Sequence, residues 1–377
     1  MAGVYIHIPF CRKRCYYCDF FKSTDLSLKI SLLDGLKREL ELRSAELLSD
    51  EITTIYLGGG TPSVLSVDEL KDLLINVQSN YQVCADAEIT IEANPDDLSY
   101  EKLSALRQMG YNRLSMGIQS FAASDLKRMN RRHGVEEAIQ SVKWAKEAGF
   151  DNISIDLIYG LPDQNQEEWE HNVRMAIELD VQHISAYNLT YHEGTVFYEQ
   201  LKNGILNELS DELSIQQFEL LIKLLKEAGF EHYEISNFCK PGYYSKHNSA
   251  YWKNKKYIGI GPSAHSFDLQ TRRWNVSSIP DYLLGIESNA YYELEVLSEQ
   301  DQYNDYIITG LRTIWGVSEE YIQTQFSPGY YLHFRKIKQK YMQSGHMSIT
   351  GSTVCLNDSG LFISDKIMAD FMVVDLC

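Results

Sequence analysis

Three cysteines lie within eight residues near the start of the chain, at Cys11, Cys15 and Cys18. Thiolates favour zinc or iron–sulfur clusters, and a structural zinc needs a fourth nearby Cys or His to complete its tetrahedron. No fourth ligand follows, because residue 20 is phenylalanine. The spacing C-x3-C-x2-C therefore predicts a 4Fe-4S cluster with one open iron that a small molecule can coordinate. The alternative is three buried structural cysteines, since a free Cys is often a small core residue.

The size and charge of the chain narrow the class of protein. With 377 residues, the chain is expected to form one large domain and a smaller one. A net charge of −17 argues against a nucleic-acid partner and against an anionic membrane surface, since both attract basic proteins. The sequence contains no secretory signal, no apolar run of membrane-spanning length and no disulfide pattern. We therefore expect a cytoplasmic protein without a transmembrane segment.

Short apolar runs rich in β-branched residues alternate with amphipathic segments, which is the pattern of βα units. Strands are predicted at residues 4–8, 53–57, 88–93, 113–118, 152–158 and 183–189. Helices are predicted at residues 27–48, 68–77, 135–148 and 211–228. Six such units in series predict an α/β fold in which a parallel sheet curls into a partial (β/α)6 TIM-like barrel.

The pattern changes after the sixth strand. Residues 231–267 are rich in Tyr, His, Asn and Gly and are interpreted as an insertion or a closing strand. Helices are then predicted at 303–314, 318–326, 331–343 and 364–374, with short strands at 346–349 and 354–356. We expect a core barrel at 1–290, extended at about 230–290 by a porphyrin-binding or haem-binding region. A small, mainly helical C-terminal domain is expected at 291–377.

Polar residues follow the apolar runs where the predicted strands end. In a parallel βα barrel the carboxyl ends of the strands carry the active site. The glycines at 58–60 leave backbone groups open to a ligand, although a tight loop is the alternative. The candidate site residues at these ends are Cys11, Gly59, Gly60, Thr61, Glu92, Gln119, Asp156 and Asn188.

The cysteine spacing resembles the signature of the radical S-adenosylmethionine superfamily. Over nearly the whole chain, longer segments resemble the oxygen-independent coproporphyrinogen III oxidases and their relatives. The matching segments are Tyr5-Ile-His-Ile-Pro-Phe-Cys11, Leu57-Gly-Gly-Gly-Thr-Pro-Ser63, Glu92-Ala-Asn-Pro-Asp96, Ser115-Met-Gly-Ile-Gln-Ser-Phe121, Arg131-Arg-His133 and Asp156-Leu-Ile-Tyr-Gly-Leu-Pro162.

This resemblance implies that the open iron binds S-adenosylmethionine, which an electron from the cluster cleaves to a 5′-deoxyadenosyl radical. A protein that donates electrons to the cluster is implied as a partner. By the same resemblance Tyr5 and Tyr17 lie against S-adenosylmethionine. Its remaining contacts would come from Gly59, Gly60, Thr61, Glu92, Gln119, Arg131 and Asp156. The alternative for each is an ordinary polar group at a strand end.

Two departures separate the chain from the oxidases themselves, which carry a further cysteine at the position of Phe20 and an N-terminal arm before the barrel. Both point to the haem chaperones of the same family, whose C-x3-C-x2-C-Asp-Phe signature ends here at Phe20. The segment His247-Asn-Ser-Ala-Tyr251-Trp252 resembles an H-N-x-x-Y-W motif associated with haem binding in that branch. It implies that His247 ligates haem iron while the two aromatic residues pack on the porphyrin. The alternative is a loop histidine beside two core aromatics.

The resemblance implies a haem chaperone that binds a 4Fe-4S cluster, S-adenosylmethionine and haem, and transfers haem to an acceptor protein. One alternative is a coproporphyrinogen III oxidase, which decarboxylates its substrate oxidatively by radical chemistry. Another is an iron–sulfur scaffold without a tetrapyrrole ligand. The chaperone is preferred over the dehydrogenase, and the sequence leaves open whether the protein is an enzyme.

Overall fold

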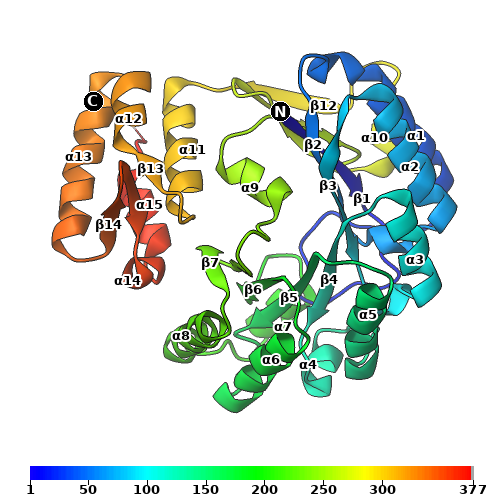
Figure 1. Ribbon diagram of the computed structural model, residues 1–377, viewed down its shortest axis with the longest axis horizontal. Helices are drawn as coiled ribbons and strands as arrows, with labels where there is room; N and C mark the ends of the chain where they lie inside the picture. Colours follow the sequence, from blue (N-terminus) through cyan, green and yellow to red (C-terminus); the bar gives the residue numbers. More distant parts are fainter. Residues whose placement is uncertain (375–377) are drawn as a thin grey trace.

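A computed structural model describes residues 1–374. Its main feature is one twelve-stranded sheet, and Figure 1 shows the curved arrangement of its strands. The strand order is β12-β11-β10-β9-β1-β2-β3-β4-β5-β6-β8-β7. Six consecutive strands pair in parallel: β1 (Ala2–Ile8), β2 (Ile52–Gly59), β3 (Val83–Ala93), β4 (Arg113–Gln119), β5 (Ile153–Tyr159) and β6 (His183–Asn188). The predicted α/β partial barrel is confirmed.

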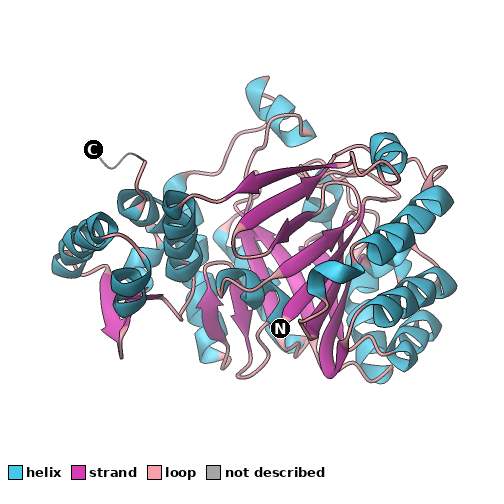
Figure 2. Cartoon of the chain, turned by 90° about the horizontal axis from the view of Figure 1, so that it is seen from above, coloured by secondary structure: helices cyan, strands magenta, loops and turns pink. Residues whose placement is uncertain are grey.

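Helices cover the outer face of this sheet, and Figure 2 shows the strands as one layer with helices along it. The strands attract helices because their outward residues are apolar: Val4, Ile6 and Ile8 are fully buried on β1. The connecting helices are α1 (Lys29–Leu42), α2 (Val67–Asn80), α3 (Tyr100–Met109), α4 (Ala123–Arg128), α5 (Val135–Glu147), α6 (Gln166–Glu178), α7 (Val196–Lys202) and α8 (Asp211–Glu227). Short 3-10 turns lie at Ser44–Leu47, Pro62–Val64 and Pro95–Asp97.

The inner face of the sheet is polar. Side chains alternate along a strand, and the register places Tyr5 beside Tyr56 and Glu92 beside Ser115 on the same face. The inner face of β1–β6 therefore carries Tyr5, His7, Thr54, Tyr56, Glu88, Thr90, Glu92, Arg113, Ser115, Ser154, Asp156, His183 and Ser185. We refer to this surface as the inner face.

Residues 231–296 extend the sheet at both edges. At one edge β8 (Asn237–Cys239) pairs with β6, and β7 (Glu231–Glu234) pairs with β8. At the other edge β9 (Tyr257–Ile260) pairs in parallel with β1, followed by β10 (His265–Phe267), β11 (Thr271–Asn275) and β12 (Tyr292–Val296). Two short helices, α9 (Lys246–Trp252) and α10 (Ile279–Gly285), lie between these strands. In Figure 1, α9 lies on the side of the sheet opposite the outer helices.

A buried ion-pair network joins α1 to the added strands. Glu39 is fully buried and accepts hydrogen bonds from Tyr282 Oη at 2.6 Å, Gly261 N at 2.7 Å and Asn275 Nδ2 at 2.9 Å. Arg43 Nη1 lies 3.0 Å from the same carboxylate. These contacts hold the segment that contains β9, β10 and β11 against α1.

The C-terminal part, drawn in yellow to red in Figure 1, has its own hydrophobic core. It contains α11 (Glu299–Leu311), α12 (Glu319–Gln325), α13 (Pro328–Gln343), α14 (Asp358–Leu361) and α15 (Ser364–Phe371). Its antiparallel sheet has the order β13 (Val317–Ser318), β15 (Thr353–Leu356) and β14 (Met347–Thr350). The large sheet runs to Val296, so the boundary expected at residue 290 falls just before its last strand.

Two further observations concern all the described residues. None of the helices formed by residues 1–374 is both long and apolar enough to span a bilayer. Six cysteines in this range, including Cys84, Cys239 and Cys355, have free thiols. Cys377 lies outside the described residues.

Candidate functional site

The three N-terminal cysteines lie on a loop that begins at the carboxyl end of β1. We call residues 11–22 the cysteine loop. Main-chain hydrogen bonds hold it in place: Cys11 N donates to Ser23 O at 2.9 Å and Tyr16 N donates to Met129 O at 3.1 Å. Thr61 N donates to Phe10 O at 2.8 Å just before the loop. The cysteines therefore sit over the strand ends of β1 and β2.

Each of two sulfurs receives a hydrogen bond from a neighbouring strand end. Thr61 Oγ1 lies 3.3 Å from Cys11 Sγ, and Arg131 Nη1 donates to Cys15 Sγ at 3.3 Å. Burial raises the pKa of the Cys11 thiol to about 11, so its thiolate needs a cation for charge compensation. Donors to sulfur of this kind tune the reduction potential of iron–sulfur clusters.

The donor set fits an iron–sulfur cluster, because three thiolates from one loop are ligands of the kind that such clusters use. Among residues 1–374, no three His, Cys, Asp or Glu side chains converge to hold one metal ion. In a cluster each thiolate binds a separate iron, so the three sulfurs need not meet at one point. The remaining described cysteines lie on other elements, with Cys239 buried in β8 and Cys355 in β15. The described chain thus offers three thiolates from one loop.

Arg131 joins the cysteine loop to the ends of β3 and β4. Its Nη2 donates to Asn94 Oδ1 at 2.7 Å and to Gly117 O at 2.6 Å, and its Nη1 lies 3.4 Å from Tyr17 Oη. Its Nε is buried and has no hydrogen-bond partner among the described residues. Because a buried donor without an acceptor is costly, this nitrogen is available to a ligand carboxylate.

The glycines at the end of β2 have a packing role. Gly59 has φ +106°, and a Cβ there would lie 2.4 Å from His7 Cε1. A Cβ at Gly60 would lie 2.7 Å from the carbonyl carbon of Pro9. Side chains at these positions would displace β1 and the start of the cysteine loop, so the structure requires glycine whether or not a ligand is present.

Two carboxylates, Glu92 and Asp156, share the inner face. Glu92 accepts hydrogen bonds from Tyr56 Oη at 2.8 Å and Gly59 N at 3.0 Å. Burial, with Asp156 nearby, raises the pKa of Glu92 to about 7. Burial also raises the pKa of Asp156 to about 6. Both groups can accept hydrogen bonds from the hydroxyl groups of a ligand.

Two further predicted residues border this area. Gln119 has φ +71° beside a register shift in β4, and its Nε2 would lie 2.9 Å from a Cβ built on Gly117. Its amide therefore lies near Arg131. Tyr5 Oη donates to His7 Nδ1 at 3.0 Å, because His7 Nε2 is the atom that donates to Phe21 O at 3.2 Å.

His247 occupies a different environment from the one predicted. It lies in helix α9, not in a loop, and is 1% exposed. Its Nδ1 is 2.8 Å from Thr54 Oγ1 and its Nε2 is 2.8 Å from Tyr251 Oη. Burial, with Arg113 nearby, lowers the pKa of His247 to about 3. Ligation of haem by this imidazole would require one of these hydrogen bonds to break and α9 to leave the inner face.

The sequence reasoning missed a carboxylate that fastens the cysteine loop. The side chain of Asp97 is 2% exposed, accepts a hydrogen bond from Ser63 Oγ at 3.1 Å and lies 3.1 Å from Arg12 Nε. Arg132 Nη1 approaches the same carboxylate at 3.4 Å. The sequence signal that could have identified it is the pair of adjacent aspartates, Asp96 and Asp97, which follows the end of β3 after Asn94-Pro95. It also missed Glu88, whose carboxylate accepts the backbone N–H groups of Lys246 and His247 at the start of α9.

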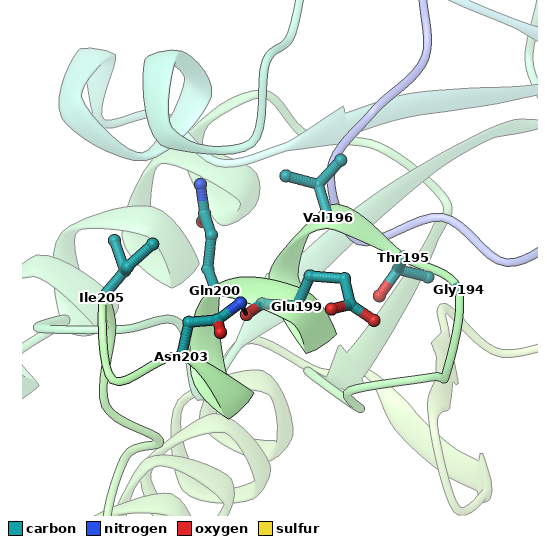
Figure 3. A pocket seen from close by; sticks show the side chains of 7 residues that line it. All are labelled: Gly194, Thr195, Val196, Glu199, Gln200, Asn203 and Ile205. Atoms are coloured by element: carbon teal, nitrogen blue, oxygen red, sulfur yellow. Dashed lines mark hydrogen bonds between the residues drawn. The ribbon is translucent and has the colours of Figure 1, made fainter.

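A surface hollow of about 230 Å³ lies beside the cysteine loop, over α7 (Figure 3). Arg14 Nη2 donates to Gly194 O at its edge. Its lining residues are Gly194, Thr195, Val196, Glu199, Gln200, Asn203 and Ile205. None of them belongs to the predicted site, which lies on the inner face and the strand ends.

Comparison with known proteins agrees with this geometry. Residues 5–176 match the model of the radical SAM superfamily. The chain is 34% identical over 376 residues to the Heme chaperone HemW of Bacillus subtilis, covering 99% of both chains. The chain belongs to the HemW family. The Heme chaperone HemW of Escherichia coli is 40% identical over 266 residues, covering 70% of this chain and 69% of that protein.

Among solved structures, the Escherichia coli coproporphyrinogen III oxidase HemN, a radical SAM enzyme, has a TM-score of 0.85 at 25% identity. The similarity covers 98% of this chain and 89% of the HemN chain. The matches to the Bacillus subtilis HemW and to HemN therefore both include the C-terminal helical part as well as the barrel. Membership of the HemW family agrees with the branch that the sequence motifs indicated.

Proposed function

We propose that the protein is a haem chaperone that binds a 4Fe-4S cluster, S-adenosylmethionine and haem, and passes haem to an acceptor protein. The observation that supports it most directly is the cysteine loop, in which Thr61 and Arg131 donate to two of three thiols. The similarity to proteins named Heme chaperone HemW over 99% of the chain supports the same function.

Cys11, Cys15 and Cys18 would hold the cluster, and the strand-end residues would hold S-adenosylmethionine. Arg131 Nε would donate to the ligand carboxylate, and Glu92 and Asp156 would accept hydrogen bonds from ribose hydroxyls. The remaining proposed contacts are Tyr5, Tyr17, Gly59, Gly60, Thr61 and Gln119. When bound to a reduced cluster, S-adenosylmethionine supplies radical chemistry.

The partners proposed for this function are a haem-acceptor protein and a protein that donates electrons to the cluster. The acidic chain, with net charge −17, disfavours nucleic acid as a further partner. A reducing, cytoplasmic location is proposed because the six described cysteines have free thiols.

A second candidate function is that of coproporphyrinogen III oxidase, which the fold shared with HemN favours. Anaerobic incubation of the reconstituted protein with coproporphyrinogen III and S-adenosylmethionine separates the two functions. The chaperone should yield no vinyl product, and vinyl product would establish the oxidase. Titration with haem then tests the chaperone directly: a Soret band that saturates is expected, and its absence would leave an iron–sulfur scaffold.

A further inference from the structure

The histidines differ in whether they can offer a nitrogen to a metal. Among residues 1–374, three histidines on or against the inner face have both ring nitrogens bonded to protein oxygens, namely His7, His183 and His247. Every other histidine in this range has at least one ring nitrogen without a protein partner, and two of these, His171 and His265, are exposed and have no hydrogen-bond partner at either nitrogen. His171 lies on the outer helix α6, whereas His265 lies on strand β10.

His265 belongs to the inner face. Phe267 pairs with Tyr257 on β9, and Tyr257 pairs with Gly3 on β1, so these three residues share one face of the sheet. His265 precedes Phe267 by two positions and therefore points to the same side. Its cross-strand neighbour is Trp274, whose ring centroid lies 6.3 Å away with an angle of 28° between the ring planes.

His265 also lies near the end of the inner face that carries the cysteine loop. Strand β10 runs antiparallel to β9, so His265 lies toward the carboxyl ends of β9 and β1. Gly259 on β9 pairs with Tyr5 on β1, and a Cβ built on Gly259 would lie 2.8 Å from the carbonyl carbon of His265, so the His265 backbone lies close against this end of β9. Desolvation of part of the ring, with Arg272 nearby, lowers the pKa of His265 and so favours the neutral imidazole, which has the lone pair that iron requires.

We propose that His265 is the residue of this chain that ligates haem iron, with the porphyrin against the inner face of β9 to β11. This inference rests on the proposed haem-chaperone function. Trp274 lies beside the imidazole, with the two ring planes 28° apart. His247 differs because its two nitrogens are already bonded to Thr54 and Tyr251. It positions α9 against β2.

The test is haem titration of the full chain with its reconstituted iron–sulfur cluster, comparing wild type with His265→Ala, His265→Met, His247→Ala and His171→Ala. His265→Ala should shift the Soret band and weaken haem affinity about tenfold or more, as expected when a metal site is disturbed. His265→Met should restore binding with a changed spectrum, because thioether replaces imidazole as the ligand. His171→Ala, the matched exposed histidine, should behave as wild type.

The possible outcomes separate this inference from the proposed function. An unchanged Soret band and affinity in His265→Ala, with both lost in His247→Ala, would overturn the inference and assign the ligand to the α9 motif. Failure of the wild-type chain to bind haem would overturn the proposed function itself. Retention of the iron–sulfur absorption in each variant shows that its barrel is folded.

Discussion

The Arg131 guanidinium donates to the Cys15 thiol at 3.3 Å from Nη1, while its Nη2 binds Asn94 and Gly117 at the ends of β3 and β4. One side chain therefore fixes the Cys15 thiol relative to the barrel. Its planar fork reaches these partners simultaneously, which an ammonium group on a flexible stem cannot reproduce.

Replacing Arg131 with Lys should lower the iron content after anaerobic reconstitution, although the charge is retained. The Lys variant loses the fork that bonds both the thiol and the strand ends. The cluster content is measured as iron and sulfide bound per chain, together with the visible charge-transfer absorption of the cluster. Arg174→Lys is the matched control, because Arg174 forms an exposed pair with Glu170 on α6. Wild-type cluster content in Arg131→Lys would show that the guanidinium has no part in holding the site.

Replacing Cys11, Cys15 or Cys18 with Ser should abolish the 4Fe-4S absorption, because each thiolate binds a separate iron. Cys84→Ser is the control, since this half-buried cysteine lies on β3 near Glu51. Its cluster content should equal that of wild type. An equal loss in Cys84→Ser would remove the assignment of the cluster to the cysteine loop.

The pKa of Glu92 predicts how the stability of the metal-free protein depends on pH. The value rises from 4.5 to about 7 in the folded chain, so between these pH values the folded state binds more protons than the unfolded state. The free energy of unfolding therefore falls as pH rises through this window, by about 3 kcal/mol at about 1.4 kcal/mol per pH unit. Urea unfolding at pH 5 and pH 8 measures the difference.

The variant Glu92→Gln should flatten this dependence, because an amide does not titrate. Some slope should remain, since the pKa of Asp156 is also raised, to about 6. Glu219→Gln on the exposed face of α8 serves as control and should keep the wild-type slope. If Glu92→Gln keeps it too, the buried carboxylate is ionised throughout this range.

Replacing Glu39 with Gln should destabilise the barrel by about 3 kcal/mol, because the buried partners of the carboxylate lose their charge-assisted hydrogen bonds. The unfolding midpoint in urea, followed by tryptophan fluorescence, should fall accordingly. Glu41→Gln is the control: Glu41 has a side chain 52% exposed and pairs with Arg38, so its change should be below about 1 kcal/mol. Equal midpoints for the two variants would show that the Glu39 network adds nothing to stability.

The six barrel strands could be predicted because their signal is local. Outward residues such as Val4, Ile6 and Ile8 are apolar, and each run is followed by a helix with its own apolar stripe. The strands β7 to β12 could not be predicted in the same way. They have three to five residues each, which is too short for a periodic pattern, and the two that join the barrel, β8 and β9, pair with strands far away in the sequence.

The residues of the candidate site also differ in whether a local sequence pattern identifies them. The cysteine spacing is a local pattern, and it identified the loop that the structure places at the strand ends. The environment of His247 depends on Glu88, which lies 159 residues earlier and accepts the N–H groups at the start of α9. A motif alone contains no information on such a partner, so the helix and its burial were missed. For Gly59, the glycine run predicted a loop open to a ligand. The contact that requires glycine there is with the His7 ring, which lies far away in the sequence.

The parallel pairing of β1 with β9 has a consequence for folding during synthesis. Strand β1 leaves the ribosome well before its register partners Tyr257 to Ile260, which are synthesised more than two hundred residues later. At about 5–20 residues per second, one edge of β1 stays unpaired for about ten seconds or longer. The cysteine loop directly follows this strand. Iron–sulfur assembly during synthesis would therefore meet a half-paired strand, and a nascent chain stalled before β9 would expose that edge to aggregation.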